Sequence, residues 1–203
     1  MCLAVNEGNA VGKKVLVHGG SGGVGSFAIQ LLKAWGASVT TTCSTDNIEF
    51  VRQLGADVIV NYRQENFVEV LQHDYDVVLD TIGLLRHYEG PSLAVLKKFG
   101  DAKYVSLVSP SFVFQRYLGL FLGSIAYNWF YRLKILHSRL LYGRGFFYCT
   151  ANPSKESLDY IRPLVEDGQL KPVISSVYSL DEVKAAYQQV ADGHSRGKVI
   201  IKM

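Results

Sequence analysis

A glycine-rich segment near the start of this chain constrains its fold more than any other feature. The apolar run Val15–Val17 is followed by Gly20, Gly22 and Gly25 in G-x-G-x-x-G spacing, and an apolar segment with helical periodicity comes next. In this pattern one glycine makes a tight turn, one lets a pyrophosphate approach the backbone, and one packs the helix against the strand. The N–H groups at the helix start then face the phosphates. The segment therefore predicts the strand, turn and helix of a dinucleotide-binding site.

Strand-like and helix-like segments alternate over the first two-thirds of the chain. This alternation is typical of repeated βαβ units, which form a parallel sheet covered on both faces. We therefore expect an α/β fold of the doubly wound, or Rossmann, type. The strands of this sheet are expected at Lys14–His18, Ser38–Cys43, Asp57–Val60, Tyr75–Asp80, Tyr104–Val108 and Phe146–Thr150.

Helices are expected between these strands and beyond them. Asn152 and Pro153 open a helix that Gly168 closes, and Ser179 with Glu182 forms a capping box for a further helix. The remaining expected elements are the helices Val24–Trp35, Asn47–Leu54 and Leu93–Phe99, closed by Gly36, Gly55 and Gly100, and a last strand at Lys198–Ile201.

Composition excludes several classes of protein. The 203 residues include 48% hydrophobic and 19% charged residues, which is enough to bury a large core. The net charge is only +3 and no Lys/Arg run occurs, so no nucleic-acid partner is expected. The three cysteines are far apart in sequence and lack zinc-ligand spacing, so we expect reduced thiols and no metal site. No targeting segment is visible at Met1, and the longest uncharged stretch, Tyr117–Tyr131, is too short to span a membrane.

The end of the second expected strand favours NADPH over NADH. NAD sites of this type place an Asp or Glu there to bind the ribose hydroxyls. Here the segment is Thr40–Ser44, which has no carboxylate, and Ser44 can donate to a 2′-phosphate. Tyr62 and Arg63 can supply a phenolic donor and a cation. Two alternatives stay open: Asp46 turns inward, or Tyr62 only packs on adenine and Arg63 is a solvated charge.

The turns after the fourth and fifth expected strands should line the rest of the cofactor. Ligands of open α/β sheets lie beyond the carboxyl ends of the strands, where Asp80–Gly83 and Leu107–Pro110 occur. Asp80 can equally cap a turn. The cofactor carries the hydride chemistry, and no catalytic residue is assigned. His18, at the end of the first strand, is expected to be a packed histidine rather than an acid or base.

Three motifs resemble the medium-chain dehydrogenase/reductase superfamily and, within it, the zinc-lacking quinone oxidoreductase branch. They are His18–Gly25, Leu54–Asp57 with the following Asn61 and Tyr62, and Gly193–Val199. The resemblance implies a quinone-reductase-like, NADPH-dependent oxidoreductase that transfers a hydride to a quinone or a similar conjugated carbonyl. It further implies that the pyrophosphate is held by Ser21, Gly22, Gly23 and Val24, and that the 2′-phosphate is bound by Ser44 and Tyr62. The nicotinamide half would be approached by Leu107, Gly145 and Phe147. The cofactor would be closed over by His194, Ser195 and Arg196. Alternatively, Arg196 is a surface charge and His194 a helix-end cation.

The same resemblance predicts the domain organisation. Members of this branch carry a GroES-like catalytic domain before the cofactor domain, and this chain begins too late to contain it. We therefore expect an NADP-binding Rossmann domain over residues 1–169 and, over 170–203, a tail that belongs to the catalytic domain in the family. The isolated chain is expected to be inactive. A mitochondrial location and a reticulon-type protein partner are also implied. A homodimer is a separate expectation.

Two other function classes are compatible with the sequence. The chain can be a catalytically inactive NADPH-binding sensor or interaction module. Alternatively, residues 112–141, in which aromatic and basic residues alternate at helical intervals, can form a helix for a membrane surface or a partner. The competing interpretation of this segment is a helix that covers the sheet or forms a dimer seam.

Overall fold

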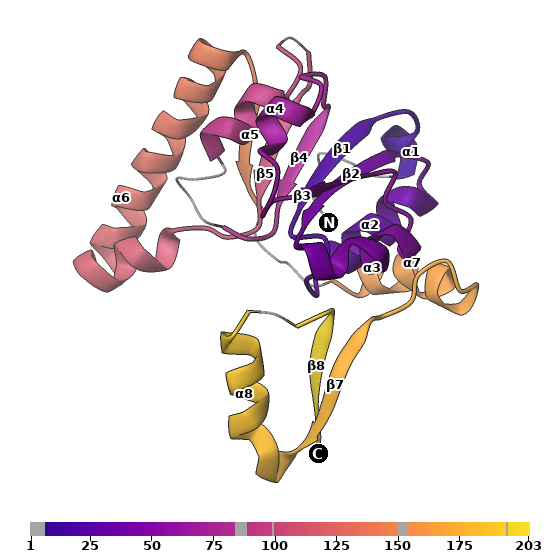
Figure 1. Ribbon diagram of the computed structural model, residues 1–203. Coiled ribbons are helices and arrows are strands. Elements are labelled where there is room, and N and C mark those ends of the chain that lie inside the picture. The colour runs from indigo at the N-terminus through magenta and orange to yellow at the C-terminus, as the bar shows by residue number, and fades with distance from the viewer. Residues whose placement is uncertain (1–6, 84–88, 99, 150–153, 194) are drawn as a thin grey trace.

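The computed structural model describes residues 7–83, 89–98, 100–149, 154–193 and 195–203. Six strands form one parallel sheet in the order β3-β2-β1-β4-β5-β6 (Figure 1). The chain moves outward from β1 on one side and then returns to add β4 on the other, which is the doubly wound order. The predicted fold class is thus confirmed. The strands are β1 Lys14–His18, β2 Ser38–Cys43, β3 Val58–Asn61, β4 Val77–Asp80, β5 Lys103–Ser106 and β6 Gly145–Tyr148.

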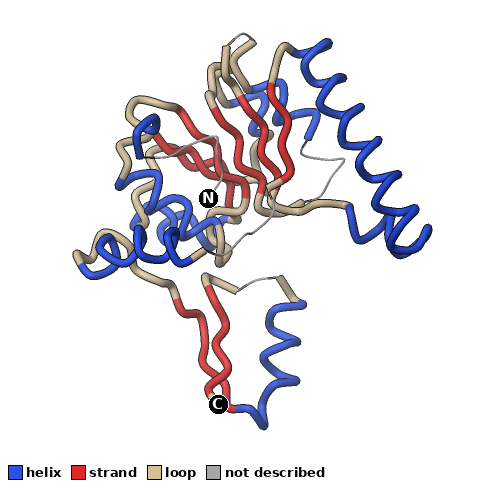
Figure 2. Tube along the Cα trace, turned by 180° about the vertical axis from the view of Figure 1, so that it is seen from behind, coloured by secondary structure: helices blue, strands red, loops and turns tan. Residues whose placement is uncertain are grey.

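Helices cover both faces of this sheet (Figure 2). Successive strand residues point to opposite faces, so Val15 and Val17 belong to one hydrophobic cluster and Leu16 to the other. The first cluster lies under α2 (Gly25–Ala34), α3 (Ile48–Gln53) and α7 (Lys155–Glu166), and the second under α4 (Phe67–Val70), α5 (Glu89–Val95) and α6 (Ser111–Tyr142). The short helix α1 (Glu7–Ala10) comes before β1, and the 3-10 turn η1 (Thr45–Asn47) comes directly before α3.

One helix prediction differs from the structure, and one cannot be compared with it in full. The expected helix Leu93–Phe99 is instead α5, which ends at Val95, and Leu96 forms a β-bridge with Tyr75. Pro91 is accommodated because it lies in the first turn of α5, where backbone N–H groups have no intrahelical partner. The expected helix start at Asn152 and Pro153 lies outside the described residues, as do Phe99 and Thr150. Within the described part, Ser154 caps α7 by accepting a hydrogen bond from the Ser157 N–H (3.1 Å).

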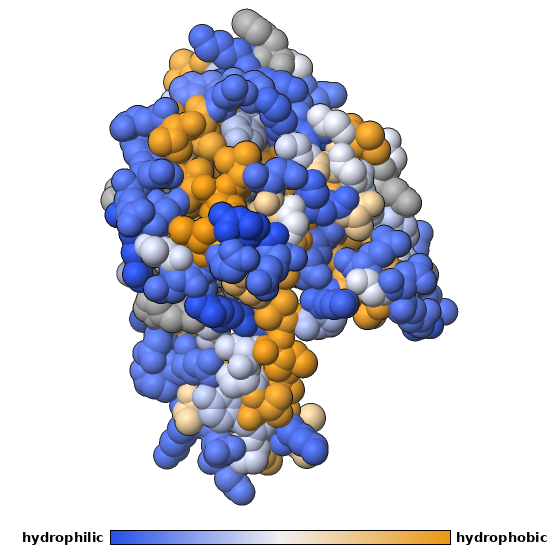
Figure 3. Space-filling model, turned by 45° about the vertical axis from the view of Figure 1, so that its right-hand side comes forward, coloured by the Kyte–Doolittle hydropathy of each residue, from blue (hydrophilic) through white to orange (hydrophobic). Residues whose placement is uncertain are grey.

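The last thirty residues form a small unit below the main sheet in Figure 1. β7 (Ile174–Ser179) pairs in parallel with β8 (Lys198–Lys202), and η2 (Leu180–Glu182) and α8 (Val183–Ala191) connect them. The predicted capping box is confirmed, whereas β7 was not predicted. Figure 3 shows hydrophobic side chains along this unit, in agreement with the exposure of Ile174 and Val177.

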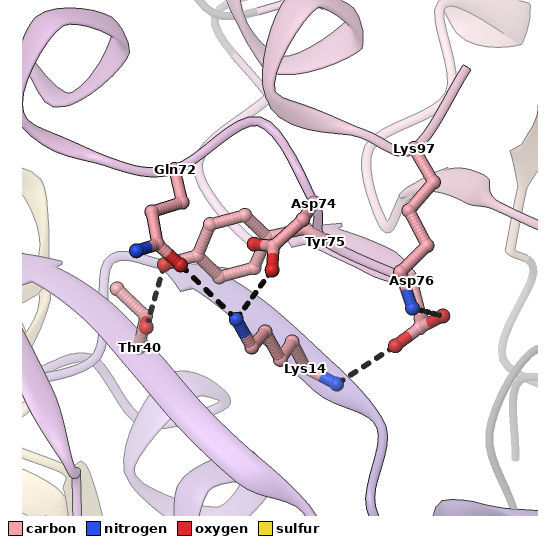
Figure 4. A network of polar contacts seen from close by, with 7 residues as sticks. All are labelled: Lys14, Thr40, Gln72, Asp74, Tyr75, Asp76 and Lys97. Carbon is pink, nitrogen blue, oxygen red and sulfur yellow. Dashed lines mark hydrogen bonds and ion pairs between the residues drawn. The ribbon is translucent and has the colours of Figure 1, made fainter.

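A polar network closes the amino-terminal edge of the main sheet (Figure 4). The Lys14 ammonium pairs with Asp74, and the Lys14 N–H donates to Asp76 (2.9 Å). Asp76 also binds the Lys97 ammonium (2.6 Å). These side chains thus form two ion pairs, Lys14–Asp74 and Lys97–Asp76, at the edge opposite the glycine loop.

α6 covers β5 and β6 and bends near its start. Gly119 has a non-helical backbone (φ 77°, ψ 168°), which separates a short first segment from the long second one. In the second segment Tyr127, Phe130 and Tyr131 pack against the core. Within the described residues, no helix is both long enough and apolar enough to cross a bilayer.

Arg144 ties the end of α5 to the start of β6. Its buried guanidinium donates to the carbonyls of Lys97 (3.1 Å), Leu96 (2.6 Å) and Leu93. Burial lowers the pKa of this guanidinium. We expect Arg144→Leu to lower the free energy of unfolding by about 2 kcal/mol, because several buried carbonyls lose their donor. Chemical denaturation measures this change, and Arg52→Leu, at an exposed surface ion pair, should cost little in comparison.

Candidate dinucleotide site

The glycine loop joins β1 to α2 at the carboxyl end of the central strand. Gly20 N–H donates to Thr42 O and Gly22 N–H to Gly19 O, both at 3.1 Å, which holds the turn in shape. Ser26 N–H donates to Gly22 O (2.9 Å) and begins the helix. In the described part of the chain, no group accepts a hydrogen bond from the N–H of Gly23. The start of α2 thus offers a donor to an anion.

The glycines of this loop are required for two different reasons. A Cβ at Gly25 would lie 2.2 Å from Gly19 O, and one at Gly20 would lie 2.1 Å from Thr41 Oγ1. Only glycine fits at these two positions. At Gly22 the nearest atom would be Gly19 O, at an ordinary 3.4 Å. The space above Gly22 is therefore open to a ligand, as a loop that binds pyrophosphate requires.

The C-terminal segment crosses the loop. Gly197 N–H donates to Ser21 O (3.1 Å), and Gly22 and Gly197 form a β-bridge. A Cβ at Gly23 would lie 2.9 Å from Gly197 O. Residues Gly22 and Gly197, 175 positions apart in sequence, thus meet at the predicted pyrophosphate site. Of the three predicted tail residues, Ser195 donates to Gln189 O (3.4 Å), and His194 lies outside the described residues.

Asn47 links the loop, the end of β2 and the tail. Its Nδ2 donates to Ser21 Oγ (3.2 Å) and Ser44 Oγ (3.0 Å), while its Oδ1 accepts from Arg196 Nε (2.7 Å). Arg196 also donates to Asp46 O (2.6 Å). Arg196 is thus exposed but held near Ser44 by hydrogen bonds to Asn47 and Asp46. Asn47 was not predicted as a site residue. The sequence feature that could have indicated it is an amide side chain in the turn directly after the second strand.

Asp46, Arg63 and Tyr62 are the remaining groups at this end. The Asp46 carboxylate is 72% exposed and lies 3.7 Å from the Arg63 guanidinium, so it pairs with that cation. Tyr62 is 46% exposed, and its N–H donates to Cys43 O (3.1 Å), which places it beside the end of β2. Ser44, Tyr62, Arg63 and Arg196 thus surround this strand end with donors and positive charge. Such a set suits a phosphate monoester.

The turn after β4 is fixed by Asp80. Its carboxylate accepts from the N–H groups of Ile82 (2.9 Å) and Gly83 (3.0 Å) and from the Tyr104 hydroxyl (2.7 Å). The turn-cap interpretation of Asp80 is therefore the observed one. Leu107, whose N–H donates to Asp80 O (2.9 Å), begins the neighbouring turn.

The predicted nicotinamide residues are not all brought together. Gly145 begins β6 and pairs with Lys103, the first residue of β5, at the amino-terminal edge of the sheet. It lies about 10 Å along the strand from the carboxyl edge. Phe147 is nearer to that edge and 42% exposed. The geometry thus groups Leu107 with the glycine loop and leaves Gly145 apart.

An apolar cavity of about 870 Å³ extends from the loop across the sheet face. Its walls include Val24 and Phe27 from the start of α2, Leu107 beyond β5, and Tyr160 from α7. This volume is within the range of small-molecule sites. The cavity therefore gives a hydrophobic compound access to the carboxyl edge.

His18 has a structural position below the loop. It is fully buried, its ring nitrogens lie 3.2 Å from Thr42 Oγ1 and 2.9 Å from Ser92 Oγ, and burial lowers its pKa to about 4. The expectation of a packed histidine agrees with this environment.

The low pKa of His18 predicts a pH effect on stability. The unfolded histidine titrates near 6.5 and the folded one at about 4, so the unfolded state binds more protons between these values. Stability should therefore fall as the pH is lowered from about 6.5 to about 4. Denaturation at several pH values measures this slope, and His18→Gln should flatten it. An unchanged slope in the variant would show that other groups cause it.

Comparisons with known proteins agree with this geometry. The family model described as "Zinc-binding dehydrogenase" matches residues 54–201. The chain belongs to this family. It is the medium-chain dehydrogenase/reductase family inferred from the motifs, so that prediction is confirmed.

Individual relatives extend the comparison. The chain is 38% identical over 204 residues to NAD(P)H oxidoreductase RTN4IP1, mitochondrial, of Danio rerio, and 37% identical over 203 residues to the Homo sapiens protein of that name. These alignments cover 98% of this chain but 51% and 50% of the relatives, so the chain spans about half their length. The solved quinone oxidoreductase of Coxiella burnetii has a TM-score of 0.74 at 29% identity, covering 98% of this chain and 56% of that one.

The family's name raises the question of a metal. Nowhere in the described ranges do three or more His, Cys, Asp or Glu side chains gather so that they can hold a metal ion. The described cysteines are Cys43, which is buried, and Cys149, which is partly buried. Burial raises the pKa of the Cys43 thiol to about 11.

Proposed function

We propose that this chain binds NADPH as part of an oxidoreductase. One observation carries the proposal: Asn47 gathers Ser21, Ser44 and Arg196 at the end of β2, where the nearby Asp46 carboxylate pairs with Arg63. A hydroxyl, an amide and a guanidinium there stabilise a 2′-phosphate, and the open space above Gly22 accommodates the pyrophosphate. The residues present therefore fit the cofactor. Titration calorimetry with NADPH and NADH tests the choice, and equal affinities would contradict it.

Each part of the site has a separate task in the proposed reaction. NADPH supplies a hydride from its nicotinamide ring. The Gly23 N–H and the start of α2 hold the pyrophosphate, while Ser44, Tyr62 and Arg196 hold the adenosine end. The apolar wall at Leu107 excludes water from the reacting end. The chain's own residues thus bind and orient, and no catalytic residue is assigned.

Ser44→Asp should reverse the cofactor preference. The new carboxylate would repel a 2′-phosphate and accept hydrogen bonds from ribose hydroxyls. We expect affinity for NADPH to fall about tenfold and affinity for NADH to rise. Ser44→Asn is the matched neutral control and should change neither affinity as strongly. Calorimetric titration of both variants with both nucleotides gives the comparison.

We propose a quinone or another conjugated carbonyl as the hydride acceptor. The apolar cavity supports this class, and so do two relatives: the Coxiella burnetii quinone oxidoreductase and, at 29% identity, the trans-enoyl reductase pgmF of Aspergillus terreus. NADPH oxidation followed with a soluble quinone and with an enoyl thioester distinguishes the two acceptors. Binding of NADPH without turnover of either would favour the second candidate, a sensor or interaction module.

Location, partner and domain organisation are proposed from the relatives. Relatives are named mitochondrial, and one from Caenorhabditis elegans is named Reticulon-4-interacting protein 1. We propose a mitochondrial location, tested by fractionation, and a reticulon-type partner, tested by binding to a purified reticulon domain. We also propose that residues 170–203 pack on a second domain, because Ile174 and Val177 are more than half exposed.

A further inference from the structure

The outer surface of α6 is apolar although no described residue covers it. Large side chains spaced three or four residues apart form one line along the helix, with exposures from 44% (Ile125) to 74% (Leu140). The opposite line, which includes Tyr127 and Tyr131, packs on the sheet. A helix that only covers a sheet has a polar outer side. The line of exposed residues consists of Leu122, Ile125, Trp129, Leu133, Leu136 and Leu140.

The bend of α6 carries a second group of exposed apolar side chains. The first segment folds back on the second, so that the Phe114 and Phe130 rings lie 5.3 Å apart. At the bend Tyr117 is 80% exposed, and Leu120 and Phe121 are each 77% exposed. Figures 1 and 2 both show this end of α6 away from the sheet. We call the bend and the exposed line together the α6 outer surface.

The charges of α6 are all positive. Its 32 residues include three arginines and one lysine, and no Asp or Glu. Lys134 pairs with Glu89. Among the described residues, no acidic group pairs with Arg116, Arg132 or Arg139, all of which are exposed. Helical spacing places Arg132 and Arg139 along one margin of the apolar line. Exposed apolar side chains with adjacent arginines suit a partner that is both hydrophobic and anionic.

We propose that the α6 outer surface binds an anionic phospholipid bilayer. Leu120, Phe121 and Trp129 enter the headgroup region, and the arginines contact lipid phosphates while their stems remain in the apolar layer. The helix lies on the membrane and does not span it. A second copy of the chain is a poorer occupant, since α6 packed on α6 would bring arginines together without a counter-charge.

Vesicle flotation of the full chain tests this proposal. The chain should float with vesicles of phosphatidylcholine and phosphatidylserine, less with phosphatidylcholine alone, and less at high salt. Leu120→Ser combined with Phe121→Ser should lower partitioning about tenfold or more. Leu158→Ser on α7, at a residue 63% exposed, is the matched control and should leave it unchanged. Arg132→Gln with Arg139→Gln should remove the preference for the anionic vesicles.

Trp129 provides an independent signal. Its fluorescence should shift to shorter wavelength with anionic vesicles, and Trp129→Phe should lose this shift, because the other tryptophan, Trp35, is buried. Failure of the unmodified chain to float would overturn the proposal. A second result would also overturn it: the chain binds no vesicles, but sedimentation shows that it self-associates and that Leu120→Ser combined with Phe121→Ser abolishes this self-association. Both results are distinguishable from failure of the NADPH proposal, because nucleotide affinity is measured on the same variants.

Discussion

Gly22→Asp should reduce affinity for NADPH about a thousandfold while the domain stays folded. A Cβ at Gly22 meets only Gly19 O at 3.4 Å, so the fold tolerates a side chain there. A bound pyrophosphate would instead face a carboxylate at close range, and like charges in contact cost several kcal/mol. Calorimetry measures the affinity, and thermal melting of the unliganded protein measures the fold.

Two matched variants separate the causes. Gly22→Asn adds similar bulk without charge and should weaken binding less than the aspartate does. Gly25→Ala should destabilise the unliganded domain, because its Cβ would lie 2.2 Å from Gly19 O. If Gly22→Asp binds NADPH normally, the pyrophosphate does not lie above this loop.

Arg196→Gln combined with Asn47→Ala should weaken NADPH binding about a hundredfold and leave NADH binding nearly unchanged. The double substitution removes the Arg196 cation and also the Asn47 amide, which donates to Ser44 and Ser21. Hydrogen bonds to charged groups contribute about 1.5–3 kcal/mol each, and NADH lacks the phosphate that would receive them. Affinities for both nucleotides, measured by calorimetry, give the selectivity.

Arg162→Gln serves as the control for a general loss of positive charge, since Arg162 is exposed on α7 beside Asp159. A double variant that loses affinity for both nucleotides equally would show that Asn47 and Arg196 only maintain the loop. In that case the 2′-phosphate is bound elsewhere, and Tyr62 and Arg63 are the next residues to replace.

The sequence predicted the sheet well because its signals are local. The strands of the main sheet are short segments rich in β-branched or aromatic residues, and the first two strands match their predicted bounds. The capping box at Ser179 and Glu182 is likewise a short-range pattern. β7 was missed because its pairing with β8 spans more than twenty residues and its side chains are largely exposed. No buried apolar alternation marked it as a strand.

The candidate site was predictable only in part. The glycine pattern and the missing carboxylate at Ser44 are visible in the sequence, and the structure places both at the same edge. The position of Asn47 depends on a contact with Arg196, 149 residues away, which no local pattern reveals. The role of Gly145 stays a prediction from the resemblance, which carries no information on the register that places Gly145 at the amino-terminal edge of the sheet.

The bridge between Gly22 and Gly197 has a consequence for motion. Because the tail's backbone is hydrogen-bonded to the loop, neither segment can shift without straining the other. A nucleotide that orders the loop would thereby slow exchange of amide protons in β8 and rigidify a unit whose outer face it does not touch. Amide exchange in β8, whose Lys198 lies against Gly23, would then report whether the loop is occupied.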